Sequence, residues 1–192
     1  MAITTKSNLD QLVSSAQNGD RNAFSELVRI HSLGVRNVVY RVCGNRQMAE
    51  DAAQEAFIRA WTKLSSYSPK VSFKSWLYRI AVNAALDMLR KEKRILPNAL
   101  EDLKLRDINP TPEAMLASTE RADLIAKALS SLSDASRTVL ILREYEELSY
   151  NEIAETLEIP MGTVMSRLSY ARKLLKEKLA VALFASAEDK NG

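Results

Sequence analysis

The stretch that decides the fold covers residues 51–94 and reads DAAQEAFIRAWTKLSSYSPKVSFKSWLYRIAVNAALDMLRKEKR. It predicts two amphipathic helices joined by a short polar break at residues 65–70, because apolar residues recur at three- and four-residue steps on both sides of the break. The recurring residues are Ala49, Ala53, Ala56, Phe57, Ala60 and Leu64 in the first helix and Phe73, Trp76, Leu77, Ile80, Ala84 and Met88 in the second. We expect both apolar faces to be buried in a helical bundle.

Half of the twelve aromatic residues of the chain lie in this stretch, interleaved with lysines and arginines. Single-stranded nucleic acid binders use this combination, because rings stack on unpaired bases at about 1–3 kcal/mol each while cations follow the phosphates. Aromatic residues on an apolar stripe are more often core residues, so we assign Phe57, Phe73 and Trp76 to the core. Tyr67 lies in the polar break, where burial and exposure for contact are both open.

The composition favours an all-helical protein of one or two domains, because 192 residues include only five glycines and five prolines. No apolar run approaches the roughly 20 residues of a membrane span, and the N-terminus lacks the pattern of a secretory signal. The lone Cys43 is expected to be a buried small hydrophobe, and with the single His31 it cannot build a His/Cys metal site. We therefore expect a cytoplasmic protein without metal or other cofactor.

The net charge of +3 conceals an asymmetry along the chain. Residues 1–95 carry fifteen Lys and Arg against eight Asp and Glu, whereas residues 113–192 carry ten against thirteen. A basic N-terminal half suits a polyanionic partner, although a basic surplus alone is a weak signal.

Local signals divide the first 45 residues into two helices. A short helix over residues 8–18 ends at Asn18 and Gly19, and Asp20 then caps a longer helix that reaches Cys43. Gly34 lies inside the longer helix, where a glycine costs roughly 1 kcal/mol relative to alanine.

Residues 96–112 read as a linker, because they contain three of the five prolines and no sustained periodicity. A helical pattern resumes over residues 113–131, and Ser133 can cap the next helix, with Asp134 in its first turn. The acidic run Glu144, Glu146 and Glu147 ends that helix, and we interpret it as a solvated face.

The second strong pattern covers residues 148–179 and is typical of a helix-turn-helix. Ser149 and Glu152 form a capping box, and Pro160 cannot continue a helix, which predicts a tight turn over residues 158–161. A second helix follows from about Gly162; a plain helical hairpin is the alternative. In a helix-turn-helix the start of the second helix meets base edges, which selects Thr163, Ser166 and Arg167, while Arg172 and Lys173 are placed for phosphates. The acids of residues 144–158 are expected to lie away from this DNA face.

The sequence DAAQEAFIRAW followed by FKSWLYRIAVNAALDMLR resembles the second region of bacterial extracytoplasmic-function (group IV, sigma-70-type) sigma factors of RNA polymerase. GTVMSRLSYARKLL resembles the fourth region of the same family. The resemblance implies an all-α protein with two small domains: residues 1–95 for region 2, a flexible linker over residues 96–112, and residues 113–192 for region 4.

Three sets of site residues follow from the resemblance. For docking on core polymerase they are Asp51, Gln54, Glu55 and Ile58. For recognition and melting of the promoter −10 element they are Tyr67, Lys70, Ser72, Lys74, Tyr78, Arg79 and Asn83. For the −35 element they are Thr163, Ser166, Arg167, Tyr170, Arg172 and Lys173. The family usually has a basic residue at the position of Met165 and often at that of Tyr170, so its standard −35 preference does not carry over directly.

The resemblance implies a non-enzymatic polymerase subunit that binds duplex DNA at −35 and single-stranded DNA at −10, and that an anti-sigma factor masks. No nucleotide-binding loop, metalloprotease motif or nucleophile elbow occurs in the sequence. The alternative is a helix-turn-helix regulator that binds duplex DNA without being a polymerase subunit.

Overall fold

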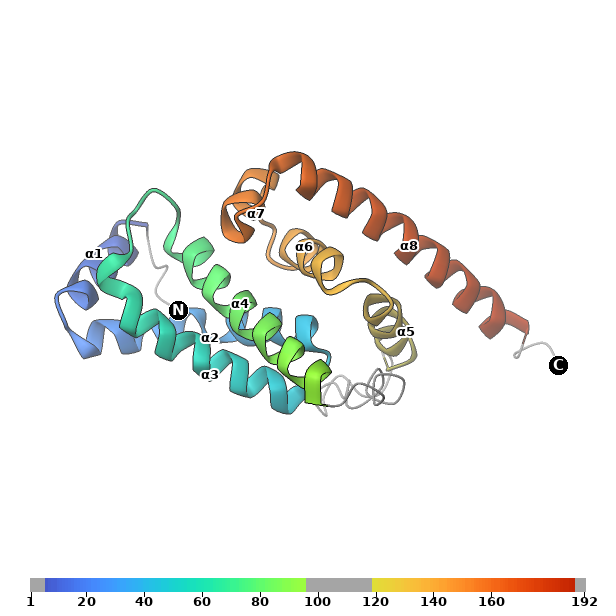
Figure 1. The fold of residues 1–192 in the computed structure, drawn as a ribbon, viewed down its shortest axis with the longest axis horizontal. Helices are drawn as coiled ribbons and strands as arrows, with labels where there is room; N and C mark the ends of the chain where they lie inside the picture. The colour runs from blue at the N-terminus through green and yellow to red at the C-terminus, as the bar shows by residue number, and fades with distance from the viewer. Residues whose placement is uncertain (1–5, 96–118, 189–192) are drawn as a thin grey trace.

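The computed structural model describes residues 6–95 and 119–188, and every regular element in these ranges is helical. The N-terminal unit consists of α1 (Lys6–Gln17), α2 (Arg21–Cys43), α3 (Arg46–Lys63), a 3₁₀ turn (Leu64–Ser66) and α4 (Phe73–Ile95). The C-terminal unit consists of α5 (Thr119–Ser130), α6 (Asp134–Glu144), α7 (Tyr150–Leu157) and α8 (Met161–Glu188) (Figure 1). The all-α prediction is confirmed; the linker predicted over residues 96–112 lies outside the described residues.

Local capping sets the helix ends that the sequence predicted. The Asp20 side chain accepts hydrogen bonds from the backbone N–H groups of Asn22 and Ala23 at 2.8 and 3.2 Å. Gly44 ends α2 in the left-handed conformation at φ 68°, and the Asn45 side chain then caps α3. Cys43 is buried as expected, and burial raises the pKa of its thiol to about 12.

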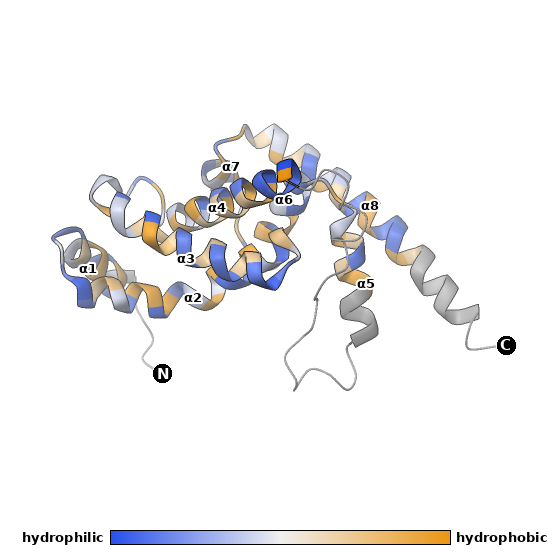
Figure 2. Cartoon of the chain, turned by 60° about the horizontal axis from the view of Figure 1, so that its bottom comes forward, coloured by the Kyte–Doolittle hydropathy of each residue, from blue (hydrophilic) through white to orange (hydrophobic). Residues whose placement is uncertain are grey.

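The N-terminal unit packs α4 against α2 and α3. Five alanines give α3 a flat buried face: Ala49, Ala52, Ala53, Ala56 and Ala60. Small side chains let helix backbones approach closely, so α4 can lie in the middle of the bundle with most of its circumference covered. In Figure 2, the helices of this unit carry both hydrophilic and hydrophobic positions, as amphipathic bundle helices do.

The C-terminal unit contains the predicted helix-turn-helix. The Ser133 hydroxyl caps α6, and Ser149 and Glu152 form the complete capping box of α7. Three residues of α8, Val164, Leu168 and Ala171, are 0–1% exposed and seat this helix on α6 and α7. Their spacing fixes which side of α8 faces outward, because residues three and four apart share one helix face.

The two units pack directly on each other. Helix α4 contacts α7, and α2 contacts α6, so that α4 lies between α3 and the C-terminal unit (Figure 1). One hydrophobic core runs through both units and includes Val38 of α2 and Leu142 of α6. Within the described ranges, no helix is both long and apolar enough to cross a membrane.

Candidate nucleic-acid interface

The predicted polymerase-docking residues share one face of α3. Asp51, Gln54, Glu55 and Ile58 occupy positions i, i+3, i+4 and i+7 of the helix, opposite the buried alanine face. Three of them are exposed and Glu55 is half-buried; Ile58 exposes 52% of its surface. An isoleucine with half its surface in water, flanked by polar groups, is a typical centre for a protein contact.

The polar break carries a compact cluster of aromatic rings. The half-buried Tyr67 ring lies 5.7 Å from the Phe73 ring and 5.2 Å from the Trp76 ring, measured between centroids. Its hydroxyl donates a hydrogen bond of 2.8 Å to the carbonyl oxygen of Val71, which holds the loop closed. Phe73 is buried, as predicted, while Phe57 and Trp76 are partly buried and pack against the core. Tyr67 is therefore anchored through its hydroxyl, and of the two rings beside it Phe73 is buried and Trp76 is partly accessible.

The other −10 candidates of the loop have different surroundings. Lys70 is exposed, and Ser72 accepts a hydrogen bond of 3.1 Å from the Ser75 N–H, which caps the start of α4. Asn83 is exposed on α4, seven residues after Trp76, which is about 10 Å along the helix axis on the same face. Tyr67 thus lies beside Trp76, and Asn83 lies on the same face of α4 as Trp76, farther along the helix.

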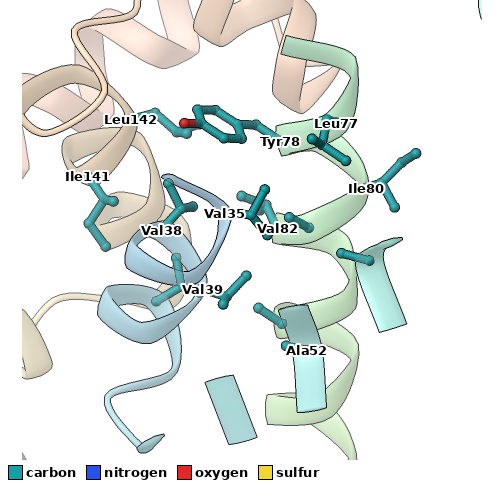
Figure 3. Close-up of a cluster of buried hydrophobic side chains, with 14 of the residues drawn as sticks. Val35, Val38, Val39, Ala52, Leu77, Tyr78, Ile80, Val82, Ile141 and Leu142 are labelled. Atoms are coloured by element: carbon teal, nitrogen blue, oxygen red, sulfur yellow. The ribbon is translucent and has the colours of Figure 1, made fainter. Parts of the chain in front are cut away.

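The remaining −10 candidates face the C-terminal unit. Tyr78 is 2% exposed, and its hydroxyl donates to the carboxylate of Glu146. Figure 3 shows its ring extending from α4 toward Leu142 of α6. Burial and the Glu146 carboxylate together raise the pKa of the Tyr78 hydroxyl. Tyr78 cannot reach DNA while the two units are packed in this way.

Lys74 and Arg79 are tied to the C-terminal unit by the same packing. Lys74 Nζ lies 3.5 Å from a carboxylate oxygen of Glu146 and 3.2 Å from its backbone oxygen. Arg79 pairs with Glu158 at 2.7 Å and donates to the backbone oxygen of Glu155 at 2.5 Å. Their roles in DNA binding stay predictions, and in this arrangement their cationic groups are occupied.

In the acidic run of residues 144–147, Glu144 and Glu147 are exposed, as expected of a solvated face, and Glu146 is the exception. The Glu146 side chain is only 11% exposed, because it lies between Lys74 and Tyr78 of α4. Glu144 pairs with Arg172 of α8 at 2.7 Å, so the acids of this segment do not all lie away from the predicted DNA face. The prediction of a solvated face was wrong for Glu146, because its partners Lys74 and Tyr78 are distant in sequence.

The outward side of the start of α8 carries the predicted −35 residues. Ser166, Tyr170 and Lys173 are exposed, and Thr163 and Arg167 are half-buried. Arg172 is exposed but held by Glu144, so it would have to exchange this carboxylate for a phosphate. In a helix-turn-helix, this end of the second helix enters the major groove.

Two apolar side chains accompany these polar groups at the start of α8. Met161 and Met165 are 47% and 50% exposed, and Tyr170 is 57% exposed. Apolar groups in the major groove contact thymine methyls instead of accepting or donating hydrogen bonds. The exposed surface at the start of α8 is therefore partly apolar, although the helix as a whole carries several lysines and arginines.

Both halves of the chain match known protein families. Residues 27–95 match the model for Sigma-70 region 2, and residues 122–175 match the model for Sigma-70, region 4. The chain is 35% identical to the ECF RNA polymerase sigma factor SigW of Bacillus subtilis over 87% of this chain and 94% of that protein. The chain belongs to the extracytoplasmic-function (ECF) sigma factors. The family resemblance read from the sequence is thereby confirmed for both regions.

A second relative and a solved structure that are similar to this chain are also sigma factors. The ECF RNA polymerase sigma-E factor of Escherichia coli is 35% identical over 88% of this sigma factor and 92% of its own length. The sigma factor RpoE of Bartonella quintana, solved in complex with the anti-sigma factor NepR, is similar with a TM-score of 0.68. That match has 27% identity and covers 82% of this sigma factor and 97% of that chain.

Sequence reasoning missed the residues that join the two units of the sigma factor. Glu146 and Glu158 gave no signal, because an acidic residue after a helix is most often solvated. Gly34 did give a signal, because a glycine in a helix interior is unusual. In the structure, a Cβ at this position would overlap the Tyr78 hydroxyl and lie 3.7 Å from a carboxylate oxygen of Glu146. Within the described ranges, no three His, Cys, Asp or Glu side chains are grouped to hold a metal ion.

Proposed function

We propose that this sigma factor binds core RNA polymerase and directs it to promoters with two DNA-binding units. The N-terminal unit docks on polymerase and holds the melted −10 strand, and the C-terminal helix-turn-helix reads the −35 duplex. The observation that carries this proposal is the exposed row on α3, centred on Ile58, which a regulator that only binds duplex DNA does not need.

The α3 row supports protein docking through both its shape and its chemistry. Ile58 supplies an apolar centre, while Asp51 and Gln54 supply polar groups at its edge. A central apolar residue with a polar rim is the usual anatomy of a protein interface. Arg59, the basic residue that follows Ile58 on this helix, is paired with Glu55 at 2.7 Å and Asp87 at 3.2 Å, so carboxylates offset its charge beside the row.

Binding of the single strand is supported by Tyr67 in the polar break and by Trp76 and Asn83, which share one face of α4. Stacking on Tyr67 and Trp76 would return part of the few kcal/mol that base extrusion costs. The Asn83 amide offers a donor and an acceptor to a base edge farther along the same surface. Opening of the duplex then draws on binding free energy, and no hydrolysis step is required of this chain.

The −35 contact is supported by the seating of α8. Buried Val164 and Leu168 fix the rotation of the helix, so that Thr163, Ser166 and Arg167 lie at the end that enters the groove. An anti-sigma factor is a further proposed partner, supported by the complex of the similar Bartonella quintana protein with NepR.

Run-off transcription with purified core polymerase tests the proposal. The wild-type protein should give promoter-dependent transcripts, and Ile58→Glu should weaken core binding by about tenfold or more, as loss of a central apolar contact does. Leu33→Glu is the matched control, because Leu33 is another exposed apolar residue of the same unit, 65% exposed on α2. Duplex binding without core-dependent initiation would instead identify a regulator.

A further inference from the structure

The turn between α6 and α7 contacts the first two turns of α4 through the side chain of Glu146. Glu146 is the centre of this contact: its carboxylate accepts the Tyr78 hydroxyl proton in a hydrogen bond and lies 3.5 Å from Lys74 Nζ. The Lys74 ammonium also lies 5.3 Å from the centroid of the Tyr78 ring. The three groups thus form a half-buried cluster between the two units.

Arg79, the residue after Tyr78 on α4, makes a second contact. The Arg79 guanidinium binds the Glu158 carboxylate at 2.7 Å and the Glu155 backbone oxygen at 2.5 Å. Both acceptors belong to the end of α7 and the turn of the helix-turn-helix. We call Glu146, Glu155 and Glu158 the acidic edge of the C-terminal unit.

Two residues of the turns that carry these contacts have a left-handed backbone, and one of them, Glu158, is the residue that ends α7. Among the described residues, the two non-glycine residues with positive φ are Glu147 at 57° and Glu158 at 53°. Side-chain-bearing residues rarely adopt this left-handed region, and where they do, the surrounding contacts hold them there. One of these residues follows Glu146, and the other is itself part of the acidic edge.

Two peripheral contacts join the units away from the predicted DNA residues. Lys93 Nζ lies 2.6 Å from a carboxylate oxygen of Asp134, and the Arg41 guanidinium lies 4.0 Å from the centroid of the Tyr145 ring. Burial raises the pKa of Asp134, but hydrogen bonds and charges from Lys93 and Arg137 outweigh it and lower the pKa overall. The carboxylate is therefore ionised and available for the pair at neutral pH.

We propose that the acidic edge is a docking surface for the first two turns of α4, and that this contact keeps the free sigma factor closed against the −10 strand. The inference rests on the proposed function, because it assigns Lys74, Tyr78 and Arg79 to strand binding. Carboxylates and phosphates compete for the same cations, and a 2% exposed tyrosine cannot meet a base. Strand binding then requires the units to separate, and any partner that separates them activates the protein.

Charge reversal on the acidic edge tests this inference in the full-length protein. Glu146→Lys/Glu158→Lys replaces both attractions to α4 by repulsion, and Glu147→Lys/Glu177→Lys changes the net charge equally at two exposed residues of the C-terminal unit. Affinity for a single-stranded −10 oligonucleotide is measured by fluorescence anisotropy, and the radius of gyration by small-angle X-ray scattering. Circular dichroism checks that each variant is folded.

The Glu146/Glu158 variant should bind the oligonucleotide about tenfold more tightly if about one molecule in ten of the wild type is open. Its radius of gyration should increase, and both values should stay near wild type in the Glu147/Glu177 variant. Lys93→Glu is a second opening variant, since it breaks the pair with Asp134 from the N-terminal side. It should tighten oligonucleotide binding as well, despite adding negative charge.

Equal oligonucleotide affinity and equal radius of gyration in wild type and both opening variants would overturn the inference. Run-off transcription with saturating core polymerase separates this outcome from failure of the proposed function. A wild-type protein that initiates transcription, but whose variants do not open, keeps its function and loses the closed state. A wild-type protein that never initiates with core polymerase refutes the proposed function itself.

Discussion

Acid should destabilise the N-terminal unit through His31. This residue lies on α2 with its ring centroid 5.5 Å from that of Phe73, at the start of α4. Burial, aided by the nearby Lys74 charge, lowers the pKa of His31 from 6.5 to about 4. The buried Nε2 atom has no hydrogen-bond partner among the described residues, which fits a neutral imidazole.

The direction and size of the effect follow from this depressed pKa. The unfolded chain takes up a proton near pH 6.5, whereas the folded protein resists protonation until about pH 4. The contribution of His31 to stability is therefore fully present above pH 6.5 and is lost as the pH falls toward 4. Between pH 7.5 and pH 5 the loss amounts to about 2 kcal/mol.

Urea unfolding followed by tryptophan fluorescence measures this loss. Both tryptophans, Trp61 and Trp76, belong to the N-terminal unit, so the signal reports on the part of the chain that contains His31. With a typical urea slope of about 2 kcal/mol/M, the midpoint should fall by about 1 M between pH 7.5 and pH 5.

His31→Leu is the control, because it places an uncharged apolar side chain against Phe73 and cannot take up a proton. Carboxylates that titrate in the same range act equally on both proteins, so the difference between the two pH profiles isolates His31. Parallel profiles for wild type and variant would refute the reasoning, since they would show that His31 titrates alike in the folded and unfolded chains.

The remaining predictions concern DNA. Asn83→Ala should weaken open-complex formation more than duplex binding, as permanganate footprinting and gel shift assays would show; equal losses would remove Asn83 from strand recognition. Arg167→Ala should change the −35 sequences selected from a random pool and cost about 1–3 kcal/mol at one base pair. Lys176 is exposed farther along α8, and Lys176→Ala should mainly reduce the slope of log affinity against log salt by about 1. Identical selection profiles and salt slopes for the two variants would contradict this division between base and phosphate contacts.

The elements that could be predicted from the sequence are those set by short-range interactions. Asp20, Ser133, Ser149 and Glu152 cap helices by bonding to backbone groups two or three residues away, and these bonds form wherever the helix forms. Apolar spacing likewise predicted the buried sides of α3, α4 and α8. Because each of these signals lies within one helix, the all-α class, the helix-turn-helix and the family resemblance could be predicted from the sequence alone.

What only the tertiary structure decided is how the two units use their charges on each other. Glu146 meets Tyr78 across 68 residues of sequence and Arg79 meets Glu158 across 79, and no periodicity encodes a partner that distant. Gly34 takes its meaning from the same contact, because the absent Cβ leaves room for the Tyr78 hydroxyl. The sequence by itself determined the two units and their chemistry, whereas the packing of one on the other determined which of those groups are free, since burial and ion pairing depend on neighbours in space.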